Sequence, residues 1–192
     1  MKIAVINGSP KGKYSITLQT VRYLERKYPE HEFCVLHAGQ KIKALEKDFS
    51  EAKTLLESSD ALLFSYPVYT FLAPSQLHRF IELIKQNNVA LEDKYATQIS
   101  TSKHFYDVTA HKYIEENVLD LGMRYIRGLS ADLEDLLKEK AEGKPSNFLI
   151  VFYGPFKKSS IHTPLPHLRR KYISTQPCPP LSLKNKERIR TF

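Results

Sequence analysis

Hydrophobic positions in the first 142 residues switch repeatedly between short continuous runs and a helical spacing. The runs have the length of β-strands and lie at 2–6, 32–37, 61–66, 95–101 and 123–129. Between and after them, apolar residues recur every three or four positions, which predicts helices around 18–24, 49–56, 75–84, 110–121 and 132–141. Ser75, which follows Pro74, is the expected N-cap of the third helix. The chain therefore alternates strand and helix five times.

Several of the runs are apolar on both faces of the strand, which indicates a sheet covered by helices on both sides. Five strand–helix units predict an α/β fold with a doubly wound, five-stranded parallel sheet in the flavodoxin-like order 2-1-3-4-5. In such sheets, ligands bind outside the carboxyl ends of the strands. We therefore expect the ligand site at the loops that follow the first, third and fourth strands.

The first of these loops lies within NGSPKGKYSIT (7–17) and leads into a helix N-terminus, where free N–H groups and the helix dipole favour an anion. Gly8 allows the chain to turn, and Ser9, Ser15 and Thr17 can donate hydrogen bonds to phosphate oxygens. The motif GxGxxG is absent, and GSPKGKYS only approximates GxxxxGK[ST], so a nucleotide triphosphatase is not expected. The loop is a candidate phosphate site, with a surface turn and a capped helix as the alternative.

The loop after the third strand, YPVYTFLAPS (66–75), is rich in apolar and aromatic residues where a polar connection would be ordinary. Such residues at the end of a strand favour a flat ring that stacks on them or meets them edge-on. For Val68 and Phe71, sealing the end of the core is the alternative.

The loop after the fourth strand, STSKHFYD (100–107), offers small hydroxyl side chains, Thr101 and Ser102 among them. These could hydrogen bond the polar edge of the same ring, with Lys103 placing a positive charge nearby. His104 is a candidate general acid or base, and a solvated loop histidine is the alternative. No nucleophile partner for His104 is evident, so we expect no hydrolase chemistry.

The segments NGSPKGKYSITLQT, DALLFSYPVYTF and QLHRFIE together resemble the flavodoxin-like NAD(P)H-dependent FMN reductases and quinone reductases over residues 1 to 142. The resemblance implies that the phosphate of FMN lies in the first loop and that its isoalloxazine ring contacts the other two. The cofactor-binding residues expected on this basis are Ser9, Lys11, Ser15, Thr17, Pro67, Val68, Tyr69, Thr70, Phe71, Thr101 and Ser102. Tyr14 departs from the family pattern, which has a small polar residue at its position.

The same resemblance implies a reaction in which NAD(P)H gives hydride to the flavin, which passes it to a small-molecule acceptor such as a quinone, free flavin or a nitro compound. Because the cofactor supplies this chemistry, no catalytic side chain is expected. Proteins of this family are commonly homodimers in which the partner completes the flavin pocket, so a homodimer is expected here.

Charge and proline content divide the chain near Gly143. Residues 1–142 contain 19 Lys and Arg against 20 Asp and Glu, whereas residues 143–192 contain 10 against one, together with seven of the eleven prolines. We expect 1–142 to form the FMN-binding domain and 143–192 to be a basic, mostly irregular tail. Because the composition changes within the fifth predicted helix, we hypothesise that the tail is a chain read out of frame and that the incomplete helix lowers stability and FMN occupancy.

Further sequence features limit the other classes of function. No apolar stretch has the length of a membrane-spanning helix and none resembles a secretory signal, so a cytoplasmic protein without membrane contact is expected. Cys34 and Cys178 lie 144 residues apart and the sequence has no CxxC motif, so no metal site is expected. Two alternatives remain: a flavodoxin-type electron carrier, and a binder of nucleic acid or another anionic surface through the tail. The basic residues of the tail are not interleaved with aromatic residues on a patterned element, so we do not expect a nucleic-acid partner.

Overall fold

A computed structural model describes residues 1–102 and 106–132 of the 192-residue chain. All of these residues belong to one compact unit. The fifth predicted helix, the boundary at Gly143, the tail, Lys103 and His104 lie outside the described residues, so the expectations that concern them stay predictions.

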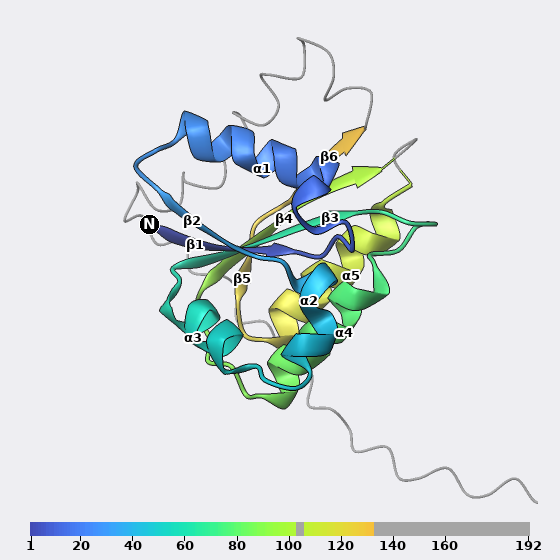
Figure 1. The fold of residues 1–192 in the computed structure, drawn as a ribbon. Helices are drawn as coiled ribbons and strands as arrows, with labels where there is room; N and C mark the ends of the chain where they lie inside the picture. Colours follow the sequence, from blue (N-terminus) through green and yellow to red (C-terminus); the bar gives the residue numbers. More distant parts are fainter. Residues whose placement is uncertain (103–105, 133–192) are drawn as a thin grey trace, which may run out of the picture. The chain divides into compact units, whose positions relative to one another are not determined.

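The described strands form one parallel sheet in the order β2-β1-β3-β4-β5, with β6 also paired to β4. This is the predicted order, with β1 between β2 and β3 (Figure 1). The strands are β1 Lys2–Asn7, β2 Glu32–Leu36, β3 Ala61–Pro67, β4 Tyr95–Ser102, β5 Arg124–Tyr125 and β6 Leu129–Asp132.

Helices cover both faces of this sheet. They are α1 Ile16–Lys27, α2 Ala38–Leu45, α3 Ser50–Ser58, α4 Ser75–Gln86 and α5 Val108–Asp120, with a short 3-10 turn, η1, at Gly12–Tyr14. In Figure 1, α1 lies on one face and the other four helices lie on the opposite face. The central strands are buried between these layers, which is why their sequences are continuous apolar runs.

Two separate hydrophobic cores result from alternation along the strands. Ile3 and Val5 face α1 and pack with Leu18, Val21 and Leu24. The opposite face of the sheet packs on the other helices through a larger core that includes Ala4, Ile6, Leu62, Phe64, Leu56, Leu77, Phe80 and Ile114.

The structure corrects three details of the expected elements. Ser75 is the first residue of α4 and not its N-cap, because Pro74 is the non-helical residue whose carbonyl accepts hydrogen bonds from the N–H groups of Leu77 and His78 at 2.8 Å and 3.2 Å. The segment between β2 and β3 holds two helices, α2 and α3, where one was expected. The fifth predicted strand is divided into β5 and β6.

The interruption between β5 and β6 coincides with a close approach of the chain to Gln98 at Gly128. β5 pairs with the start of β4, and β6 pairs with its end at Ile99–Ser102. Gly128 lies so close to Gln98 that a Cβ atom there would overlap the Gln98 side chain. Gln98 is a large polar residue in the middle of a buried strand, and the chain passes around it before pairing resumes.

The parallel register brings the expected ligand loops to one edge of the sheet. Asn7 at the end of β1 pairs with Ser65 in β3, and Pro67 at the end of β3 pairs with Thr101 in β4. The carboxyl ends of β1, β3 and β4 therefore lie side by side, as the sequence predicted.

Candidate functional site

The loop between β1 and α1, residues 8–15, is here called loop 1. Asn7 holds it in place and is fully buried at the end of β1. The Oδ1 atom of Asn7 accepts a hydrogen bond from the backbone N–H of Ser9 at 3.1 Å, and its Nδ2 donates to the carbonyl of Gly12 at 2.8 Å. The N–H of Gly8 donates to the carbonyl of Ser65 on β3 at 2.9 Å. Loop 1 is thus attached to the sheet at its base and tied to Asn7 at its middle.

Hydroxyl side chains gather where loop 1 enters α1. Ser9, Ser15 and Thr17 are all buried, with exposed fractions of 1%, 2% and 0%. Ser15 is the N-cap of α1, yet its side chain makes no capping hydrogen bond, so its hydroxyl is available to a ligand. Helix geometry leaves the N–H groups of residues 16–18 without an intrahelical acceptor, and the helix dipole adds positive potential there. These groups can bind an anion.

Charged and bulky side chains of loop 1 point to solvent. Lys11 is exposed, and its backbone N–H donates to the Ser9 hydroxyl at 3.3 Å, which leaves the hydroxyl hydrogen of Ser9 free to donate. Tyr14 is 74% exposed, with the Nζ atom of Lys13 at 5.1 Å from its ring centroid. The bulk of Tyr14 therefore does not fill the space around the buried hydroxyls.

The N-terminal part of helix α2 packs closely against loop 1. A Cβ atom at Gly39 would overlap the carbonyl oxygen of Gly8, and one at Gly12 would overlap the side chain of Gln40. Gly12 also has a φ of +55°, which favours glycine. The first turn of α2 and loop 1 are therefore fitted to each other at glycine positions.

We predict that Gly39→Ala will displace loop 1. The added methyl group cannot fit against the Gly8 carbonyl, so unfolding free energy should fall by about 1–3 kcal/mol despite the better helix propensity of Ala. Affinity for a loop 1 ligand should fall as well. Chemical denaturation measures the first effect, and Lys43→Ala on an exposed position of the same helix is the control. Unchanged stability of Gly39→Ala would show that the close contact is absent in solution.

A strained two-residue hairpin follows β3. Tyr69 and Leu72 exchange backbone hydrogen bonds at 2.9 Å and 3.1 Å, and the two residues between them, Thr70 and Phe71, both have positive φ, at 48° and 71°. Two positive φ values define a type I′ turn, for which Asn-Gly is the favoured pair. A β-branched and an aromatic residue at these positions cost energy, and strain of this kind is concentrated at functional sites.

The strained hairpin presents aromatic rings to solvent. Tyr69 is 47% exposed and Phe71 is 51% exposed, so neither seals the core. The ring of Phe71 meets the ring of Tyr106 edge-to-face, with 5.5 Å between their centroids. The core-sealing alternative for Phe71 is therefore wrong, whereas Val68 is half-buried and packs against the core.

An open pocket lies beside the hairpin and loop 1. Its volume is about 570 Å³, within the usual range of ligand sites. Pro10 of loop 1, Tyr69 and Leu72 of the hairpin, and the start of α4 up to His78 line it. Loop 1 and the hairpin therefore border one hollow.

The end of β4 completes this edge with buried hydroxyls. The Oγ1 atoms of Thr101 and Thr17 are 2.6 Å apart, so the hydroxyl of Thr17 joins α1 to β4. The carbonyl of Thr101 accepts a hydrogen bond from the N–H of Val68 at 2.9 Å, which fixes the start of the chain after β3. Among the described residues the buried Oγ of Ser102 has no hydrogen-bond partner, so a ligand could supply one.

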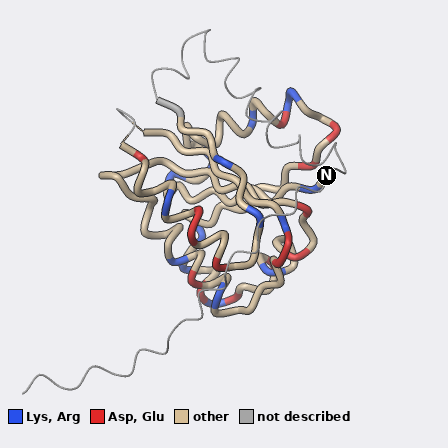
Figure 2. The backbone as a smooth tube through the Cα atoms, turned by 180° about the vertical axis from the view of Figure 1, so that it is seen from behind, with Lys and Arg blue, Asp and Glu red and all other residues tan. Residues whose placement is uncertain are grey.

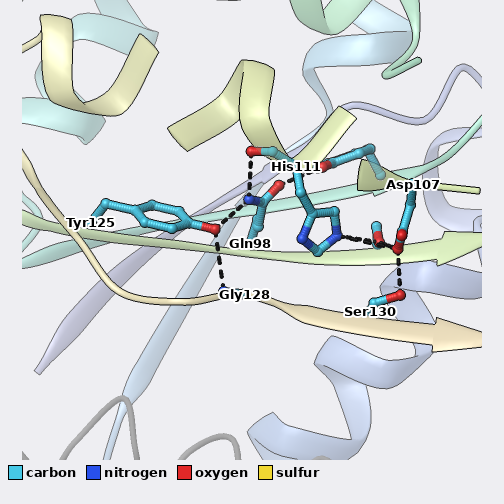
Figure 3. Close-up of polar contacts among 8 residues, drawn as sticks. Gln98, Asp107, His111, Tyr125, Gly128 and Ser130 are labelled. Carbon is cyan, nitrogen blue, oxygen red and sulfur yellow. Dashed lines mark hydrogen bonds and ion pairs between the residues drawn. The ribbon is translucent and has the colours of Figure 1, made fainter. Parts of the chain in front are cut away.

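A second polar cluster joins β4, α5 and β6 (Figure 3). The hydroxyl of Ser100 donates to Oδ2 of Asp107 at 3.1 Å, and Nε2 of His111 lies 2.7 Å from Ser100 Oγ. Ser130 also donates to Asp107. Nearby, Gln98 accepts from Tyr66 and donates to Tyr125 and to the carbonyl of His111.

This Ser–His–Asp group is not a catalytic triad. In a triad the carboxylate holds one ring nitrogen of the histidine and the serine hydroxyl faces the other. Here Asp107 lies 3.4 Å from the same Nε2 atom that faces Ser100, and Ser100 is fully buried. Since Ser100 donates its only hydroxyl hydrogen to Asp107, Nε2 must donate to Ser100 and cannot be its base. The cluster instead satisfies polar groups that the sheet buries.

The histidines predict how stability depends on pH. Burial lowers the pKa of His111 below its ordinary value of 6.5; Asp107 opposes this shift and Arg127 adds to it. Burial also lowers the pKa values of His37 and His78. The unfolded chain therefore binds more protons, so stability should be complete above about pH 6.5 and fall as the pH decreases, by at most about 1.4 kcal/mol per pH unit for His111.

Urea denaturation at several pH values measures this dependence, and His111→Asn is the informative variant. Its stability should vary less with pH between about pH 6.5 and 5 than that of the wild type. An equal slope in both proteins would exclude His111 as the cause.

The sequence missed Asn7 and His37 as residues of the site. Asn7 could have been noticed, because a polar residue at the end of the buried run KIAVIN requires partners. No sequence pattern indicates His37, because its contact with Asn7 depends on how β2 and α2 are placed relative to β1. The strained turn was also missed, since Thr-Phe does not suggest a type I′ hairpin.

The donor set fits the FMN expected from the sequence. Buried hydroxyls and free N–H groups at a helix N-terminus suit a phosphate, exposed aromatic side chains on the adjacent hairpin suit a flat ring, and the unpartnered Ser102 hydroxyl suits its polar edge. The predicted cofactor-binding residues lie in loop 1 and the first turn of α1, at and after the end of β3, and at the end of β4. The structure brings all three groups to the same edge of the sheet.

Basic and acidic positions are interspersed along the backbone (Figure 2). Of the described helices, none has the length and apolar character needed to cross a membrane. Within the same residues, no group of three or more His, Cys, Asp or Glu side chains could hold a metal ion.

Several solved structures with a similar fold are described as flavin-dependent or NAD(P)H-dependent reductases. An NADH:FMN oxidoreductase named EMOB is 20% identical with a TM-score of 0.68, over 84% of this chain and 91% of that one. An FMN-dependent NADH-azoreductase from Bacillus anthracis in complex with FMN is 15% identical with a TM-score of 0.60, over 82% and 99% of the two chains. An NADPH-quinone reductase from P. pentosaceus is 16% identical with a TM-score of 0.59, over 83% and 99%. At these identities the likeness shows a flavodoxin-like fold, and the comparison with curated proteins finds no match.

The sequence of residues 1–133 matches the model of a family described as NADPH-dependent FMN reductase. The matched segment is more than half of the chain and contains every described part of the candidate site. Proteins of this family are enzymes with FMN as cofactor and NAD(P)H as electron donor, so the alternative of a carrier without enzyme activity is set aside. The chain belongs to the NADPH-dependent FMN reductase family.

Proposed function

We propose that this protein holds the phosphate of FMN in loop 1 and the isoalloxazine ring along the hairpin and the end of β4, and that it passes electrons from NAD(P)H to a quinone, free flavin or similar small acceptor. The observation that most supports this proposal is the placement of an anion site and an exposed aromatic hairpin at one sheet edge. Family membership supports the use of FMN and NAD(P)H.

Each part of the site has a separate role in the proposed reaction. Bound FMN supplies the hydride chemistry. Ser9 and Ser15, with the N–H groups of α1, bind and orient its phosphate, while Lys11 adds positive charge at the rim. Tyr69 and Phe71 lie against the ring, and Pro67, Val68 and Thr70 shape the backbone beside it. Thr101 holds Val68 in place, and Ser102 donates to the polar edge of the ring.

The exposed hairpin also supports the expected homodimer. Tyr69, Phe71 and Leu72 are more exposed than apolar residues usually are, which suits a surface covered by ligand and by a second copy of the chain. We extend the proposal to a flavin-binding domain at 1–142, a basic tail that does not belong to it, and a cytoplasmic location.

Steady-state kinetics of the FMN-loaded protein test the proposed acceptors. NADH or NADPH oxidation, followed by the loss of absorbance of the nicotinamide, should require bound FMN and should accelerate when a water-soluble quinone, free flavin or a nitroaromatic compound is added. If none of these acceptors supports turnover while the protein retains FMN, the proposed acceptor class is wrong.

A further inference from the structure

His37 lies between β2 and α2 and contacts Asn7, the residue that ties loop 1 together. Its Nδ1 atom is 3.0 Å from Nδ2 of Asn7. His37 is the N-cap residue of α2 but makes no side-chain capping hydrogen bond, so its ring is used for Asn7 and not for its own helix. The contact therefore connects the N-terminus of α2 to the residue at the end of β1 that holds loop 1.

The orientation of the Asn7 amide fixes which partner donates. Oδ1 must be the oxygen, because it accepts the N–H of Ser9 at 3.1 Å. Nδ2 must be the nitrogen, because it donates to the Gly12 carbonyl at 2.8 Å. The Asn7 group that faces His37 is therefore a donor, and Nδ1 of His37 has to be an unprotonated acceptor.

This requirement determines the tautomer of His37. The ring must be neutral with its hydrogen on Nε2. Protonation of Nδ1 would set an N–H group against the NH₂ group of Asn7, so the hydrogen bond would be replaced by repulsion between two donors.

We infer that His37 is a positioning residue for loop 1. Its neutral ring accepts a hydrogen bond from Asn7 and so holds Asn7 in place, whereas protonation of the ring breaks this bond, so that FMN binds more weakly in acid. This inference rests on the proposed FMN site in loop 1. It adds a pH-sensitive residue that neither touches FMN nor belongs to the predicted site.

The surroundings of His37 lower its pKa from the ordinary value of 6.5. The charged groups that act on it are Lys41 on α2 and Arg22 on α1, both positive, and together with burial they lower the pKa of His37. Arg22 is itself paired with Glu25 at 2.6 Å. Asn7 on β1 is neutral. With its pKa lowered from 6.5, the ring is neutral at pH 7.

Two effects of protonation oppose each other, and their signs make the inference testable. A charged His37 near loop 1 would attract the phosphate of FMN, which predicts tighter binding in acid. Loss of the Asn7 contact leaves a buried donor hydrogen unsatisfied, which lowers the equilibrium constant for ordering of loop 1 by about 5- to 30-fold. The inference requires the second effect to dominate.

The test compares FMN binding by the full-length wild type and by His37→Asn at pH values from about 7.5 to 5. The amide oxygen of Asn can occupy the place of Nδ1 and accept from Asn7 at every pH. Quenching of FMN fluorescence gives the dissociation constant, and circular dichroism checks that the fold persists at each pH. Protonation of the FMN phosphate weakens binding by both proteins equally, so their difference isolates His37.

We expect the dissociation constant of the wild type to rise at least about fivefold more than that of His37→Asn over this range. His31→Asn, which removes a histidine just before β2 at the opposite edge of the sheet, should behave like the wild type. Equal pH dependence of the wild type and His37→Asn, or a smaller rise in the wild type, overturns the inference.

A second measurement applies even if His37→Asn does not fold. Nitrogen-15 NMR of the ligand-free wild type should show His37 neutral at pH 7 with its hydrogen on Nε2. A hydrogen on Nδ1 would overturn the inference. Failure of the wild type to bind FMN at any pH would contradict the proposed function instead, while the NMR result would still decide the role of His37.

Discussion

Ser15→Asp should remove FMN binding while leaving helix α1 at least as stable. Ser15 is the N-cap of α1 and makes no capping bond, whereas Asp is among the best N-cap residues and suits the helix dipole. The same carboxylate would face the phosphate. At about 4 Å and an effective dielectric constant of about 20, one pair of like charges costs about 4 kcal/mol, so a loss of affinity on the order of 100- to 1,000-fold is expected.

The matched control is Ser15→Asn, which is nearly isosteric with Asp, neutral and also a good N-cap. It should retain FMN much better than Ser15→Asp. Fluorescence titration with FMN and thermal unfolding of the apoproteins give the two quantities. If Ser15→Asp binds FMN as well as Ser15→Asn does, the phosphate does not lie at the N-terminus of α1.

Phe71→Gly should separate the ligand role of the hairpin from its structural role. Glycine suits the φ of 71° at this position, so relief of strain should offset the lost contact with Tyr106 and keep the unfolding free energy within about 1 kcal/mol of wild type. The aromatic contact with the flavin ring would be lost, and we expect FMN to bind about tenfold more weakly.

Phe71→Ala provides the comparison, because it removes the ring and keeps the positive φ on a residue with a Cβ. It should be less stable than Phe71→Gly by about 1 kcal/mol and bind FMN equally weakly. Chemical denaturation and FMN titration of the three proteins measure this. Wild-type affinity in both variants would mean that Phe71 does not contact the flavin.

The doubly covered parallel sheet could be predicted because a central strand that is buried on both faces has a continuous apolar run in its sequence. β1 and β3 follow this rule closely. β4 contains Thr97, Gln98 and Ser100 in the core and still lies centrally, because Gln98 donates to the carbonyl of His111 and to the hydroxyl of Tyr125, and Ser100 donates to Asp107. These partners lie outside the strand, so the sequence of the strand alone does not show how its polar side chains are satisfied.

The placement of a site residue could be predicted where it follows from the order of strands and helices. It could not be predicted where it follows from tertiary contacts. Ser9 and Ser15 follow a strand and begin a helix, so their place could be inferred from order alone. The bonds from Asn7 to Ser9 and Gly12 could not, and neither could the contact of His37, since each depends on the path of loop 1. The helix α2 was missed because Gly39 interrupts its apolar pattern, although close packing on Gly8 requires that glycine.

Titration of the apoprotein with FMN and with riboflavin tests the central claim, which is that loop 1 and the N-terminus of α1 hold the flavin through its phosphate. Riboflavin has the same ring and lacks the phosphate, so only the contacts of loop 1 differ. We expect one FMN per chain and riboflavin affinity lower by about 100-fold or more, because charge-assisted bonds to the phosphate are lost. Equal affinity for FMN and riboflavin, or no binding of FMN, would contradict the account.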